Sequence, residues 1–98
     1  MKYTLLATRI YDKSLHNVAP HVRNHIEQAV FVLEETPRAG HPLRQALKGL
    51  WSLHLKFENT HYRVIYTIDD TQHIITLRYV GSRENIYKQV QRLSRNAA

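Results

Sequence analysis

The chain has 98 residues, a formal net charge of +6, and a hydrophobic fraction of 43% with three glycines and three prolines. This composition excludes a disordered chain, and the absence of cysteine excludes disulfides and thiolate metal sites. The positive charge favours a polyanionic partner, either nucleic acid or an acidic protein.

The ends and the length of the chain give further expectations. The opening "MKYTLLATRIYDKS" has too short an apolar run for a signal peptide, and no stretch has the length of a membrane span. We therefore expect a cytoplasmic protein with no membrane contact. A chain of this length corresponds to one small domain, so we expect a single domain over residues 1–98.

The first part of the chain predicts one strand and two helices. Residues 2–8 alternate loosely and indicate a strand, and a short helical segment follows over 10–18. Pro20 is favourable in the first turn of a second helix. That helix runs to about residue 35 with an apolar stripe at helical spacing, and Thr36-Pro37 ends it.

The second part changes to a period of two. "WSLHLKF" alternates apolar with polar residues, "ENTH" reads as a turn, "YRVIYTI" as a strand, "DDTQ" as a second turn and "HIITLRYV" as a third strand. Gly81-Ser82 ends that strand, and Ser82 is the expected N-cap of a final helix over about 83–93. The order β-α-α-β-β-β-α predicts an α+β fold. We expect a small twisted, mostly antiparallel sheet with the two N-terminal helices packed on one face.

Basic side chains are expected on the other sheet face. Alternation places Ser52, His54 and Lys56 there, with Arg63 and Arg78 from the neighbouring strands. Arg83 stands in the first turn of the last helix, where the helix dipole disfavours a cation. A bound anion would explain that position, so we expect these side chains to converge near the strand ends.

Three motifs and their order carry a resemblance. "LKGLWSLHL", "YRVIYTI" and "LRYVGSRENIY", after a proline-started amphipathic helix, resemble the RelE/ParE superfamily of toxin–antitoxin toxins over nearly the whole chain. In the RelE branch this implies a toxin that cuts translated mRNA on the ribosome, is held in a hetero-oligomer by a cognate antitoxin, and uses no cofactor. The family's two arginines fall on Arg63 and Arg83, and its tyrosine falls on Tyr87, at a spacing two residues shorter than in the best-known member. Where that member has alternating lysines, this chain has Ser52 and His54, followed by Lys56.

The chemistry of RNA cleavage assigns roles to these residues. The 2′-OH attacks the adjacent phosphorus, so a site needs a proton acceptor, stabilisation of the phosphoryl oxygens and a proton donor for the 5′-oxygen. Arginine suits the phosphoryl oxygens, and His54 suits proton transfer. Tyr87 would orient the nucleophile or stack on a base. We expect Lys56, Arg78 and Lys48 to attract the RNA backbone. No metal-ligand spacing is present in the sequence.

Simpler interpretations stand beside these. Arg63 fits a surface strand residue paired with Glu58 or Asp69, and Arg83 fits a solvated arginine beside Glu84. His54 is as readily incidental as catalytic, and His61, in or near a turn, is more readily structural.

Two other functions stay open. One is a ParE-like protein that inhibits DNA gyrase by binding and cleaves nothing. The other is a basic RNA-binding module without activity.

Overall fold

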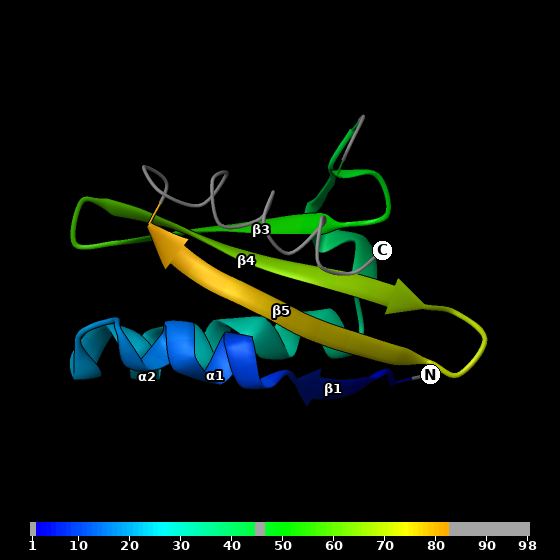
Figure 1. The fold of residues 1–98 in the computed structure, drawn as a ribbon, viewed down its shortest axis with the longest axis horizontal. Helices are drawn as coiled ribbons and strands as arrows, with labels where there is room; N and C mark the ends of the chain where they lie inside the picture. Colours follow the sequence, from blue (N-terminus) through cyan, green and yellow to red (C-terminus); the bar gives the residue numbers. More distant parts are fainter. Residues whose placement is uncertain (1, 45–46, 83–98) are drawn as a thin grey trace.

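The computed structural model describes residues 2–44 and 47–82, so the helix expected over 83–93 lies outside the described residues. Five strands form one sheet in the order β1-β5-β4-β3-β2. The strands are β1 (Thr4–Ala7), β2 (His41–Pro42), β3 (Trp51–Phe57), β4 (Thr60–Asp69) and β5 (Ile74–Ser82). β1 runs parallel to β5, and the other neighbouring strands are antiparallel. Helices α1 (Arg9–His16) and α2 (Pro20–Ala29) lie on one side of the sheet (Figure 1).

This arrangement confirms the predicted fold class and differs in detail. β1 is shorter than the strand predicted over 2–8, and α1 begins one residue before and ends two residues before the helix predicted over 10–18. α2 stops at Ala29, and the predicted helix continues as a 3-10 helix over Val30–Glu34. β2 was missed, because a two-residue strand beginning one residue after Gly40 has no periodicity to detect.

Local capping explains where the helices begin and end. The Thr8 hydroxyl accepts the Tyr11 N–H at 3.1 Å and so caps α1, and Pro20 occupies the first turn of α2 as predicted. The Arg23 guanidinium donates to two backbone carbonyls, that of His16 at the end of α1 and that of Val18 in the link to α2. These bonds satisfy backbone groups that the helix ends leave unpaired.

The main core lies between the helices and the sheet. Ile26 and Leu33 from the helical segments and Val64, Tyr66 and Ile75 from the sheet are fully buried. These positions include the apolar stripe predicted over 20–35 and alternate residues of β4. Within the described ranges, no helix is long and apolar enough to cross a membrane.

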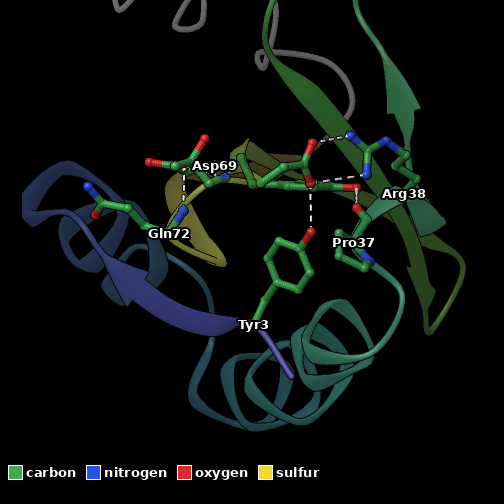
Figure 2. A network of polar contacts seen from close by, with 8 residues as sticks. Tyr3, Pro37, Arg38, Asp69 and Gln72 are labelled. Carbon is green, nitrogen blue, oxygen red and sulfur yellow. Dashed lines mark hydrogen bonds and ion pairs between the residues drawn. The ribbon is translucent and has the colours of Figure 1, made fainter. Parts of the chain in front are cut away.

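A polar network ties the segment after the helices to the sheet. Figure 2 shows Tyr3 and Arg38 converging on one carboxylate, that of Asp70. The Tyr3 hydroxyl donates to it at 2.6 Å, and the Arg38 guanidinium donates at 2.6 Å while lying 5.7 Å from the Trp51 ring centre. The chain from Arg38 onward is thereby held at the edge of the sheet.

Candidate functional site

The tight turn between β3 and β4 sets the positions of the basic side chains. Glu58 and Asn59 both have positive φ, 49° and 65°, which suits a two-residue hairpin loop. The predicted turn "ENTH" is therefore too long, because the strands already pair at Phe57 and Thr60. His61 lies within β4 and not in the turn.

The resulting register brings four basic side chains together. His54 is opposite Arg63, and Lys56 is opposite His61. Directly opposed residues share a sheet face, and their Cβ atoms lie roughly 5 Å apart. The alternate residues of β3 pack against the helices, so these four occupy the other face, as the sequence predicted for His54, Lys56 and Arg63. We call His54, Lys56, His61 and Arg63 the hairpin quartet.

Arg63 has an unmet hydrogen-bonding group. Its Nε is buried and has no hydrogen-bond partner among the described residues. The carboxylates proposed as simple partners are engaged elsewhere: Glu58 lies 3.4 Å from His21, and Asp69 accepts the N–H groups of Thr71 and Gln72. A buried guanidinium N–H without an acceptor is costly, and an anion binding beside it would supply one.

The two histidines of the quartet are in direct contact. His54 Nε2 lies 2.6 Å from His61 Nδ1, with the ring centres 4.9 Å apart and the ring planes 15° apart. The sequence analysis missed His61. Placing the loop at Glu58-Asn59, where the asparagine favours positive φ, would have put His61 beside His54.

Part of the same face is covered. Ile65 is fully buried, packed by Tyr79 and by Leu43, Leu47 and Leu50 from the segment before β3. Ser52, expected on an open face, is 2% exposed, and its hydroxyl has no partner among the described residues. Burial raises the pKa of Tyr79. Among the described residues, the face is therefore closed toward the start of β3, while His54 and Lys56 near the hairpin are exposed.

Two predicted RNA contacts lie away from the quartet. A register shift between Ile65 and Tyr66 leaves Arg78 as an extra residue on β5, and its guanidinium donates to Thr67 Oγ1 at 3.2 and 3.3 Å. Thr67 is four residues along β4 from Arg63, roughly 13 Å at about 3.3 Å per residue. Lys48 is exposed in the turn before β3, outside the strands that carry the quartet.

The remaining two predicted residues, Arg83 and Tyr87, lie outside the described residues. β5 continues through Ser82, the predicted cap of the last helix, and Gly81 is opposite Arg63. The backbone thus reaches its last described residue beside the quartet. In residues 2–44 and 47–82 no group of three or more His, Cys, Asp or Glu side chains could hold a metal ion.

Comparison with known proteins identifies relatives. A family model described as the ParE-like toxin of type II bacterial toxin–antitoxin systems matches residues 5–91. Toxin RelG of Mycobacterium tuberculosis is 30% identical over 91 residues, which cover 91% of this chain and all of RelG. A chain of the toxin–antitoxin complex RelBE2 from the same organism is 30% identical with a TM-score of 0.74, covering 85% of this chain and all of that one. A mutant of E. coli toxin RelE in the free state has a TM-score of 0.75 at 21% identity, covering 97% and 98% of the two chains, a likeness of fold.

Proposed function

Because the chain belongs to the ParE-like toxin family of type II bacterial toxin–antitoxin systems, we propose that it is a toxin that cuts translated mRNA on the ribosome. The observation that carries this proposal is the environment of Arg63. Its buried Nε has no acceptor among the described residues, and its neighbours in the hairpin are the histidine pair and Lys56. This arrangement suits a phosphodiester with a proton-transfer group at its side.

The proposed reaction is attack of the 2′-OH on the adjacent phosphorus. The O2′–P bond forms and the P–O5′ bond breaks, which leaves a 2′,3′-cyclic phosphate and a 5′-OH. Arg63 donates to the non-bridging oxygens, where charge develops, and His54 transfers a proton. Lys56 adds electrostatic attraction without needing to touch the phosphorus. By the family resemblance, Arg83 is the second phosphate ligand and Tyr87 orients the substrate.

This site needs the ribosome for physical reasons. Single-stranded RNA rarely holds its 2′-OH in line with the leaving oxygen. In the part of the chain that the structure describes, His54 and Lys56 of the quartet are exposed, and we propose that the protein alone does not impose that geometry. A ribosome that presents the message in a fixed conformation would supply this orientation, which is worth several powers of ten in rate. We therefore expect the protein to cut message on the ribosome and to leave naked RNA nearly intact.

We also propose a cognate antitoxin as the partner that holds the toxin inactive in the cytoplasm. The M. tuberculosis RelBE2 and E. coli RelBE structures are toxin–antitoxin complexes. For this chain, the basic face predicts an acidic antitoxin segment that competes with RNA for Arg63.

The first test compares arginine variants in a ribosome-dependent cleavage assay. Arg63→Ala should lower the cleavage rate by roughly two to three powers of ten, because a preorganised contact to the developing charge is lost. Arg9→Ala removes the same charge from an exposed position at the start of α1, on the helix side of the sheet, and should leave the rate unchanged. Equal losses in both variants would show that Arg63 acts only through diffuse charge.

A second candidate function is inhibition of DNA gyrase, favoured by the ParE-like description of the matching family. It requires binding without cleavage. The same purified protein should be assayed for supercoiling by gyrase and for breaks in translated mRNA. Intact message together with inhibited gyrase would replace the nuclease proposal with this one.

A further inference from the structure

The contact between His54 and His61 has a consequence for proton transfer. At 2.6 Å, Nε2 of one ring and Nδ1 of the other can form a hydrogen bond only if one carries a proton and the other offers its lone pair. Two imidazolium rings would place two protons between these nitrogens. The geometry is therefore compatible with a neutral pair or a singly protonated pair, and incompatible with a doubly protonated one.

The surrounding charges act in the same direction. Among the described residues, Arg63 faces His54 across the hairpin and Lys56 faces His61, so two permanent cations border the pair. They oppose a second proton on the histidines. A phosphate held by Arg63 would favour the first proton, because it adds negative charge beside the rings.

We propose that His61 is a positioning residue that shares one proton with His54, so that the two rings titrate as a unit. This inference rests on the proposed nuclease function and adds to it a second histidine. The pair can act first as a base and then as an acid. In the neutral pair, the ring that donates the shared hydrogen bond keeps a lone pair on its outward nitrogen, and once that nitrogen has taken a proton the pair has an outward N–H to give. Transesterification needs both, since the 2′-OH loses a proton and the 5′-oxygen gains one. The net proton count of the pair is unchanged over the whole reaction.

The direct test follows the histidine ring resonances by NMR as pH is varied, with EDTA present. In the wild-type protein, His54 and His61 should each titrate in two steps with shared midpoints, as coupled groups do. In His61→Phe, which keeps a ring and loses the nitrogens, His54 should titrate in one step. His16→Phe removes a histidine from the end of α1, outside the hairpin, and should leave the two-step curves unchanged. Single, independent steps for His54 and His61 in the wild-type protein would overturn the proposal.

The functional test uses cleavage of ribosome-bound message across pH. His61→Phe should lower the rate by about tenfold to a hundredfold and change the shape of the pH profile. His61→Asn keeps a polar amide that can bond His54 but cannot take a proton. It should restore part of the rate and keep the altered profile. Full rescue of both rate and profile by asparagine would show that His61 only orients His54, and would overturn proton sharing.

The two proposals fail separately. If the ring resonances show the coupled two-step curves and yet the wild-type protein does not cut message on the ribosome, the nuclease function falls while the proton-sharing pair stands. If the wild-type protein cuts message and His61→Phe cuts it equally well at every pH, the role of His61 falls while the nuclease function stands.

Discussion

Removing the phenolic hydroxyl of Tyr66 should destabilise the fold, because this hydroxyl links the sheet to the segment before β2. Tyr66 is fully buried in β4, and its hydroxyl donates to the Pro37 carbonyl at 2.7 Å while accepting the Gly40 N–H at 3.1 Å. It joins the sheet to the segment that precedes β2. Tyr66→Phe keeps the ring in the core and removes both bonds.

The size of the destabilisation in Tyr66→Phe depends on whether water can replace the two lost hydrogen bonds. A Cβ added to Gly40 would lie 2.5 Å from the Ser52 carbonyl oxygen and 2.8 Å from the Tyr66 hydroxyl, so the backbone here packs too closely to admit water without moving. Each lost hydrogen bond costs about 0.5–1.5 kcal/mol, and two cost about 1–3 kcal/mol. In a domain of this size, that lowers Tm by roughly 5–20 °C.

The assay is thermal and urea unfolding monitored by circular dichroism, with Tyr62→Phe as the matched control. Tyr62 lies on the same strand and the same sheet face, and the structure gives its hydroxyl no hydrogen bond to the described residues. Its variant should unfold within about 0.5 kcal/mol of the wild-type protein. If Tyr66→Phe is as stable as Tyr62→Phe, the segment before β2 is not held by this hydroxyl and the reasoning is wrong.

Two further predictions concern pH. Burial, with smaller contributions from Glu27 and Asp12, raises the pKa of Tyr11 to about 12. Between pH 10.0 and about 12 the Tyr11 hydroxyl therefore ionises only in the unfolded chain, and the stability of the folded protein should fall over this range. Tyr11→Phe should remove that fall. It should not lower the stability at pH 7, since the hydroxyl is buried without a partner in the described structure. Unfolding midpoints measured across pH check both expectations. The hydrogen bond from Arg38 holds the pKa of Asp70 below its usual 3.8, so this stabilisation is present above 3.8 and is lost as pH falls further. Asp70→Asn should therefore be the less stable protein at pH 7 and equal to wild type in strong acid.

Periodicity was enough to predict the layers of this fold. β3 and β4 alternate clearly, and the stripe in α2 repeats at helical spacing, so the faces they bury follow directly. The two-residue β2 and the parallel pairing of β1 with β5 were not predictable in this way. They depend on contacts between segments far apart in the chain, such as Thr4 with Ile74, which no local pattern encodes.

In the candidate site too, the local sequence pattern predicted some positions correctly and not others. Alternation correctly placed His54, Lys56 and Arg63 on one face, while His61 was misjudged by an error of one or two residues in the turn. Because side chains alternate, the length of a hairpin loop decides which residues face each other. Arg78 was predicted to contact RNA, but alternation does not reveal that it is the extra residue in β5. Its side chain donates to Thr67.

The hairpin quartet is a poor arrangement for stability, and that supports a functional role. Lys56 faces His61 and Arg63 faces His54, so two cations border the histidine pair, and neither cation has an ion-pair partner among the described residues. The buried Nε of Arg63 adds a donor without an acceptor among the described residues. By contrast, Arg38 is paired with Asp70 at 2.6 Å. A sequence that satisfies local rules along its strands and breaks them at four adjacent positions is typical of a site whose missing partner is a ligand. The two cations of the quartet favour an anion as that ligand, and for the proposed nuclease the anion would be the phosphodiester.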